Sequence, residues 1–273
     1  HALIGINQDP VWIEGVKNKI RRRKIEIQPH SPDEMTNMLE TWANEHRDWL
    51  NAVESRNEVY NYIPMPDGDV SRFMEFFRLF YEGIKRGAPD MDVVHNVVYD
   101  INSIHNLLGA CMEAGLERWM DILSFHYYGF GAVPPERYVA QYVDDIQSIM
   151  EQHGAGDMPL YMTEGGGGSM ACEDDPYLDK DLAFLPPLRA SEREVARILV
   201  RFHLVGLSMG VDRFYYFLPF DYQGVLSRNN GAGLLRWDGL PRWGYAAYAH
   251  MTEMLEDRTF VEQIDRAEDG LRG

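Results

Sequence analysis

The chain has 273 residues, of which 45% are hydrophobic, and a formal net charge of −17 at pH 7. This apolar fraction suffices for a sizeable core and excludes a mainly disordered chain, while the negative charge repels phosphate backbones and argues against a nucleic-acid partner. No uncharged apolar run reaches the roughly 18 residues that a membrane helix requires, so we expect no membrane span.

Neither the start of the chain nor its cysteines indicate a compartment. The sequence begins at His1, and no basic segment followed by an apolar stretch marks a signal peptide. Secretion is therefore compatible with the sequence but not indicated by it. Two cysteines, Cys111 and Cys172, are too few for a disulfide framework, and their pairing does not follow from the sequence. No Cys/His cluster has zinc-finger spacing, so we expect neither a metal site nor a cofactor.

Short apolar runs alternate with helical periodicity along the chain. The runs predict strands over 2–6, 50–56, 92–99, 121–125, 159–163 and 211–218. The periodic segments predict helices over 31–49, 69–86, 101–115, 134–153, 191–210 and 245–255. Capping boxes begin the first and fifth helices at Ser31 and Ser191, and Asp69 caps the second helix.

Six successive strand–helix units predict a parallel sheet with crossover helices. The sequence contains no G-x-G-x-x-G turn and no P-loop, and we therefore expect a (β/α)8 TIM barrel rather than a doubly wound sheet. The six units would be strands three to eight, with the first two units before His1. We expect the barrel to cover 1–256 and a C-terminal extension, where a β-domain could begin, to cover 257–273.

Two predicted strands end in glutamate, at Glu58 and Glu164. The segments after the strands are long, and in barrels these loops build the active face. Two carboxyl groups about 5–5.5 Å apart suit a retaining glycosidase, in which one is the nucleophile and the other the acid/base. A single glutamate at a strand end is more often a solvated loop residue, so the inference depends on the pair.

The strand between the two glutamates ends in His126-Tyr127-Tyr128. Residues two apart on an extended segment project to the same side, so His126 and Tyr128 can both face a site at the strand end. A phenol there could donate a hydrogen bond to a carboxylate and keep it ionised. The alternative is an aromatic cluster that closes the core.

Five segments resemble the clan A retaining glycoside hydrolases, and the family 39 β-xylosidase and α-L-iduronidase group in particular. The stretch LNAVESRNE at 50–58 resembles the strand that ends in the acid/base, and YEGIKRGAPDMDV at 81–93 resembles the passage after it. DILSFHYYG at 121–129 and PLYMTEG at 159–165 resemble the sixth and seventh strands, and GLLRWDGLPRWGYAA at 233–247 the region after the eighth.

This resemblance implies a role for each matching residue. Glu58 would be the general acid/base, and Asn57 would hydrogen-bond the sugar 2-hydroxyl. Glu164 would be the nucleophile, Tyr128 would orient it, and His126 would line the same subsite. The implied partner is an oligosaccharide or glycoside, and the implied reaction is hydrolysis of its O-glycosidic bond.

Two further aromatic residues are candidates for stacking on a sugar ring, and each has core packing as the alternative. Trp12 follows the first predicted strand, and Tyr216 lies in the last one.

The chain departs from the family pattern at three points. Arg56 stands where the family has tryptophan, Val59 stands where it has proline, and the arginine of the second strand has no counterpart. These departures leave open a glycan-binding barrel without catalysis. A barrel that uses the two carboxylates as metal ligands is a third interpretation, which we disfavour because no histidine has a helpful sequence spacing to either glutamate. The sequence leaves the oligomeric state open.

Overall fold

The computed structural model describes residues 3–5, 31–58, 68–98, 103–128, 135–166, 191–220, 233–236 and 238–262, without the side chains of 3–5 and 128. The chain divides into two compact units. The first holds His1–Tyr127 and Asp144–Thr163, and the second holds Tyr128–Val143 and Glu164–Gly273. The barrel boundary expected at residue 256 stays a prediction.

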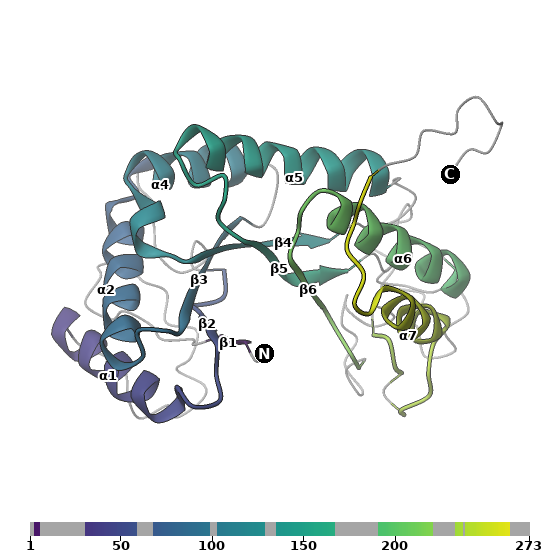
Figure 1. Ribbon diagram of the computed structural model, residues 1–273, viewed down its shortest axis with the longest axis horizontal. Helices are drawn as coiled ribbons and strands as arrows, with labels where there is room; N and C mark the ends of the chain where they lie inside the picture. The colour runs from purple at the N-terminus through teal and green to yellow at the C-terminus, as the bar shows by residue number, and fades with distance from the viewer. Residues whose placement is uncertain are drawn as a thin grey trace, which may run out of the picture. The chain divides into compact units, whose positions relative to one another are not determined.

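The first unit alternates strands and helices as predicted (Figure 1). Its elements are β1 (Leu3–Gly5), α1 (Pro32–His46), β2 (Ala52–Glu54), α2 (Ser71–Gly87), β3 (Asp92–Val98), the π-helical η4 (Ile104–Leu108), α4 (Gly109–Glu113), the 3-10 helix η5 (Leu116–Trp119) and β4 (Ile122–Tyr128). The strands are parallel, with Ile4 opposite Val53, Val53 opposite Val93, and Val94 opposite Ile122. Leu123 N then donates to Pro159 O, next to β5 (Leu160–Gly166).

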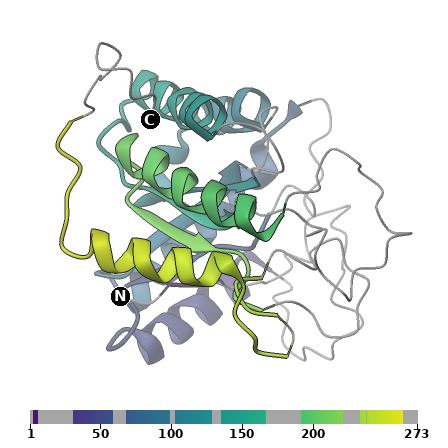
Figure 2. The ribbon, with the colours of Figure 1, turned by 90° about the vertical axis from the view of Figure 1, so that its right-hand side faces the viewer.

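Helix α5 (Pro135–Gln152) and strand β5 each begin in one unit and end in the other, and the last residue of β4, Tyr128, belongs to the second unit. The second unit also holds α6 (Glu192–Ser208), β6 (Arg213–Tyr216) and α7 (Trp243–Leu255). Phe217 N donates to Gly165 O at 2.9 Å after the end of β6, and α6 and α7 lie side by side (Figure 2).

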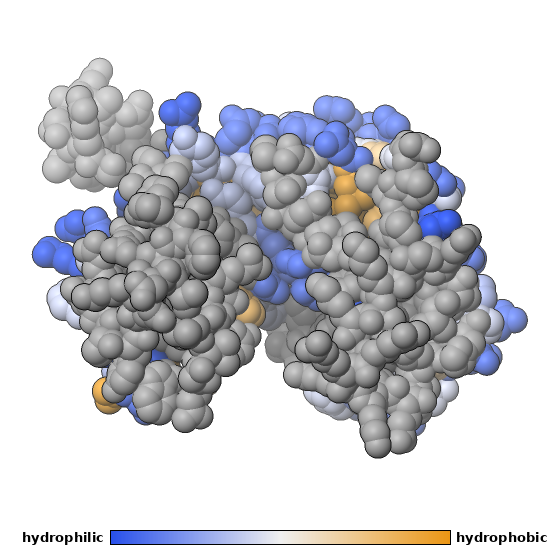
Figure 3. Space-filling model, turned by 180° about the vertical axis from the view of Figure 1, so that it is seen from behind, coloured by the Kyte–Doolittle hydropathy of each residue, from blue (hydrophilic) through white to orange (hydrophobic). Residues whose placement is uncertain are grey.

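Neighbouring strands follow sequence order, β1-β2-β3-β4-β5-β6. A doubly wound sheet reverses its strand order at a switch point, so this order confirms the barrel-type α/β fold over the doubly wound alternative. No helix within the described ranges is both long and apolar enough to cross a bilayer. The described surface seen in Figure 3 is mostly hydrophilic.

The predicted apolar face of α2 forms much of the first unit's core. Phe73, Phe77, Phe80 and Ile84 recur at helical spacing, and all four are buried. His95 of β3 packs against two of these rings, with its ring centroid 4.3 Å from that of Phe77. Burial disfavours the charged imidazole and lowers the pKa of His95 to about 3.

Predicted and observed boundaries differ at several elements; the strand expected over 211–218, for example, is regular only over Arg213–Tyr216. Two of the differences have a local cause. The strand expected over 50–56 is regular only over Ala52–Glu54. Ser55 N still donates to Val94 O of β3, but the chain bends at the next residue, Arg56. The helix expected over 101–115 is split between η4 and α4. It stops before Gly115, whose φ of +89° lies in the left-handed region that favours glycine.

Candidate active site

The turn after β2 carries the first candidate carboxylate. The chain bends at Arg56 and turns through Asn57 and Glu58. Glu58 has a φ of +48°, in the left-handed region that glutamate rarely adopts. Such a backbone costs on the order of 1–3 kcal/mol and is found preferentially at functional sites. Glu58 therefore combines a strained backbone with a place beyond the C-terminal end of a parallel strand, where barrel enzymes hold their reacting groups.

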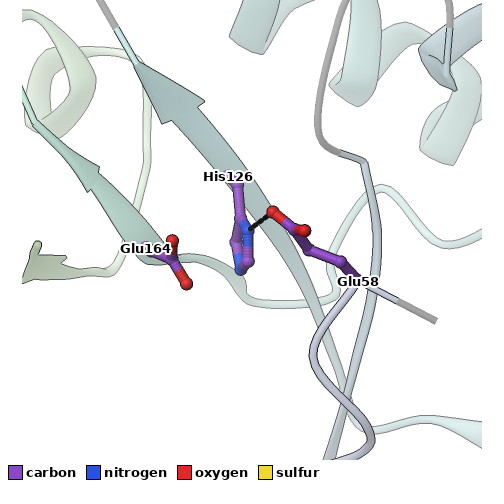
Figure 4. Close-up of side chains that lie close together, drawn as sticks. All are labelled: Glu58, His126 and Glu164. Carbon is purple, nitrogen blue, oxygen red and sulfur yellow. Dashed lines mark hydrogen bonds and ion pairs between the residues drawn. The ribbon is translucent and has the colours of Figure 1, made fainter. Parts of the chain in front are cut away.

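Strand β4 brings His126 to Glu58. Its Nδ1 lies 3.2 Å from Oε1 of Glu58 (Figure 4), and the histidine side chain is 1% exposed against 28% for the glutamate. An Nδ1–H can donate to an ionised Glu58, and a protonated Glu58 can donate to a bare Nδ1. The contact is thus compatible with both states of the carboxyl group, as a residue that gives up and regains a proton requires.

The second candidate carboxylate belongs to Glu164, which lies in the second unit, at the start of its segment Glu164–Gly273. It directly follows Thr163 on β5, and its side chain is half-buried. Gly166 ends the same strand, and a Cβ there would lie 3.0 Å from Cε2 of Tyr216. Glycine at this position therefore permits the close approach of the Tyr216 ring.

A third carboxylate, which the sequence analysis missed, lies inside the first unit. Glu54 ends β2 and is only 8% exposed. Its Oε1 accepts hydrogen bonds from Ser124 Oγ of β4 and from Thr163 Oγ1 of β5, each at 2.6 Å. The available signal was a charged residue within a buried strand, since a buried carboxylate needs hydrogen-bond donors.

Arg56, the first departure from the family pattern, is 2% exposed. Its guanidinium is enclosed within the first unit, and the residue lies between Glu54 and Glu58 in sequence. An effect of Arg56 on the substrate would therefore act through its neighbours.

Of the remaining predicted site residues, the structure describes the side chains of Asn57 and Tyr216 but not those of Trp12 and Tyr128. Asn57 is half-buried in the turn before Glu58. Tyr216 is half-buried against His203 of α6 and Tyr248 of α7, with ring centroids 6.3 and 5.9 Å away, so its described ring contacts are packing contacts. Trp12 and the side chain of Tyr128 lie outside the described residues, and their roles stay predictions.

Some of these side chains are also of types that bind metal ions. Glu58, His126 and Glu164 offer carboxylate oxygens and an imidazole nitrogen, as divalent cations prefer. The sequence argument against a metal centre relied on histidine spacing and did not anticipate that His126 contacts Glu58 from 68 residues away. The expectation that the chain has no metal site stays a prediction. Strands distant in sequence can end at one edge of a sheet, so spacing alone is no guide there.

No protein-family model matches the chain, and no curated protein sequence matches it. Solved structures do match. A family 39 glycoside hydrolase from Bacteroides cellulosilyticus WH2 aligns with a TM-score of 0.64 at 20% identity, over 91% of this chain and 51% of that one. A family 5 glycoside hydrolase of subfamily 18 from Streptomyces cattleya, solved with Manβ1-4GlcNAc, gives 0.64 at 15% identity, over 93% and 60%.

A family 39 β-xylosidase from Caulobacter crescentus aligns with a TM-score of 0.55 at 16% identity, over 82% of this chain and 48% of that one. These matches agree with the strand order in favouring the barrel over the doubly wound sheet. The fold is a partial (β/α)8 barrel. It is similar to the barrels of clan A glycoside hydrolases, and the chain spans about half the length of the structures that it matches.

Proposed function

We propose that this protein is a retaining glycoside hydrolase, with Glu164 as nucleophile and Glu58 as general acid/base. The observation that carries the proposal is the contact between Glu58, on its strained turn, and the buried His126. The similarity of the fold to glycoside hydrolase barrels supports the same reaction class. Glu164 is included because of its position on β5, where it directly follows Thr163, whose hydroxyl donates to Glu54 of β2.

The proposed reaction has two displacements. In the first, Glu164 attacks the anomeric carbon, the glycosidic C–O bond breaks, and Glu58 gives its proton to the leaving oxygen. In the second, Glu58 takes a proton from water, whose oxygen displaces Glu164 from the glycosyl ester. His126 would hold the carboxyl group of Glu58 in place through both proton transfers, and Asn57 would bind the sugar 2-hydroxyl.

The test is to trap the glycosyl-enzyme. The chain is incubated with a panel of activated 2-fluoroglycosides, digested and analysed by mass spectrometry, which should find the label on the peptide that contains Glu164. Glu164→Gln should abolish the label, whereas Glu45→Gln, which changes an exposed glutamate of α1, should retain it. A label on a different carboxylate would show that the nucleophile has been assigned wrongly.

Azide separates the two proposed roles. In Glu164→Gly, azide can enter from the nucleophile's side and should give a glycosyl azide of inverted configuration. In Glu58→Ala, the glycosyl-enzyme still forms from an activated aryl glycoside, and azide should then give the retained product. If both variants gave the same anomer, the two roles could not be divided as proposed.

A glycan-binding barrel without catalysis is the second candidate function. Arg56 and Val59, which depart from the family pattern on either side of Asn57 and Glu58, favour it. Calorimetry that detects oligosaccharide binding, together with no trapped intermediate and no turnover, would support this candidate. A metal-dependent reaction would be recognised by loss of turnover in EDTA and recovery with a divalent cation, whereas double displacement is indifferent to both.

A further inference from the structure

Glu54 connects three strands through one oxygen atom. It lies on β2, and its Oε1 accepts from Ser124 on β4 and from Thr163 on β5. Strand β3 separates β2 from β4, and neighbouring strands lie about 4.8 Å apart. The Glu54 side chain therefore reaches past β3 to Ser124 and past β3 and β4 to Thr163, and all three groups share one face of the first unit's strands.

Two hydroxyl groups donate to the same oxygen of the buried Glu54. Each lies 2.6 Å from Oε1, at the short end of the range for O–H···O hydrogen bonds. A buried carboxylate is a costly way to join strands, because apolar side chains of similar volume are usually at least as stabilising. This cost makes a purely structural role for Glu54 a weak explanation.

Each member of this cluster lies shortly before a residue of the proposed site. Glu54 is four residues before Glu58, Ser124 is two before His126, and Thr163 immediately precedes Glu164. We infer that Glu54 is a positioning residue, which fixes the end of β5 through Thr163 and thereby the direction of the Glu164 carboxylate. The inference rests on the proposed function, which it deepens by naming what orients the nucleophile.

Leaving-group dependence tests the inference on the full chain. Thr163→Val and Glu54→Leu, which remove the donor and the acceptor, are assayed with the 2,4-dinitrophenyl and 4-nitrophenyl β-glycosides of xylose, glucose and mannose. A displaced nucleophile slows formation of the glycosyl-enzyme whatever the leaving group, and a displacement of about 1 Å can cost on the order of 100-fold in rate. We expect kcat to fall 30- to 100-fold on both aryl leaving groups, with KM changed less than about threefold.

Two further variants separate positioning from loss of folding. Thr163→Ser keeps the hydroxyl and should recover most of the rate, which a general loss of packing would not allow. Thr36→Val is the control, because Thr36 also donates its hydroxyl to an oxygen, Pro32 O at 2.9 Å on α1, and is 3% exposed where Thr163 is half-buried. It should retain the wild-type kcat even if its thermal unfolding midpoint falls as far as that of Thr163→Val.

The outcomes distinguish this inference from the function on which it rests. If the wild type turns over and Thr163→Val and Glu54→Leu match the Thr36→Val rate, the positioning role is refuted and the proposed function stands. A rate loss confined to the 4-nitrophenyl substrate also refutes it, since that pattern means an impaired acid rather than a displaced nucleophile. If the wild type shows no turnover and traps no sugar on Glu164, both proposals fall.

Discussion

Replacing Gly83 with alanine tests how closely α1 and α2 pack. Gly83 lies in the interior of α2 and is buried against α1. A Cβ at this position would lie 2.7 Å from Cβ of Leu39 and 2.9 Å from the backbone oxygen of Thr36. Neither atom can rotate away, because each is fixed directly to the backbone of α1, so the helices would have to separate.

The expected effect is the difference between two opposing contributions. Carbon atoms pack best at about 3.5–4.0 Å, so the new methyl group requires a shift of the order of 1 Å. Overpacking costs about 1–3 kcal/mol, and we take the upper end because two contacts are violated together. Alanine regains about 1 kcal/mol of helix propensity over glycine. Gly83→Ala should therefore lower the free energy of unfolding by about 2 kcal/mol.

Urea unfolding followed by circular dichroism measures this difference, and Gly109→Ala is the matched control. Gly109 is also helical, with φ −53° and ψ −50°, but a Cβ there would meet no atom within 4 Å. The same substitution should therefore stabilise the protein by about 0.5–1 kcal/mol at Gly109. Equal midpoints for the two variants would refute the close packing of the helices.

Three further expectations concern buried or capping groups. Because the pKa of His95 is lowered to about 3 in the folded protein, the unfolded chain takes up a proton on this imidazole at a higher pH than the folded one, so the contribution of His95 to stability is full above about pH 6.5 and falls as the pH drops toward 3. His95→Gln should therefore reduce the change in the urea midpoint between pH 7 and pH 5. A pH dependence equal to that of the wild type would contradict this expectation. Ser191→Ala removes the side-chain acceptor for Glu194 N and should lower the free energy of unfolding by about 1 kcal/mol. Urea titration measures this loss, and an unchanged free energy would show that the cap does not stabilise α6. Burial raises the pKa of the Cys111 thiol to about 12. In a Cys172→Ser variant, Ellman's reagent should therefore react with Cys111 only after urea is added. Rapid labelling in native buffer would contradict the burial of Cys111.

Local features of the fold could be predicted from the sequence. Ser191 and Glu194 form the full capping box that their spacing indicates, and Ser31 accepts from Glu34 N as expected. The buried aromatic face of α2 follows from helical periodicity. Each of these features depends on residues within a few positions of one another, which a sequence displays directly.

The sequence indicated where site residues lie on their strands but not what they contact. Glu58 was expected at a strand end, yet its φ of +48° and its contact with His126 depend on how β2 and β4 end. Glu54 was hidden because it stands in an apolar strand and its donors come 70 and 109 residues later. Contacts between strands that are not neighbours require the curvature of the sheet, which residue spacing does not encode.

The arrangement of β4 explains how the strained turn at Glu58 is maintained. A strained backbone persists when its surroundings over-determine it. Ser124 holds Glu54 at the start of the segment, and His126 holds Glu58 at its end. Residues two apart on a strand face the same side at a fixed separation, so β4 sets the span that residues 54–58 must cover. If one residue were inserted between Glu54 and Glu58, the contacts of Ser124 with Glu54 and of His126 with Glu58 could both persist only if the turn followed a different path. The surroundings would then no longer impose a positive φ on Glu58.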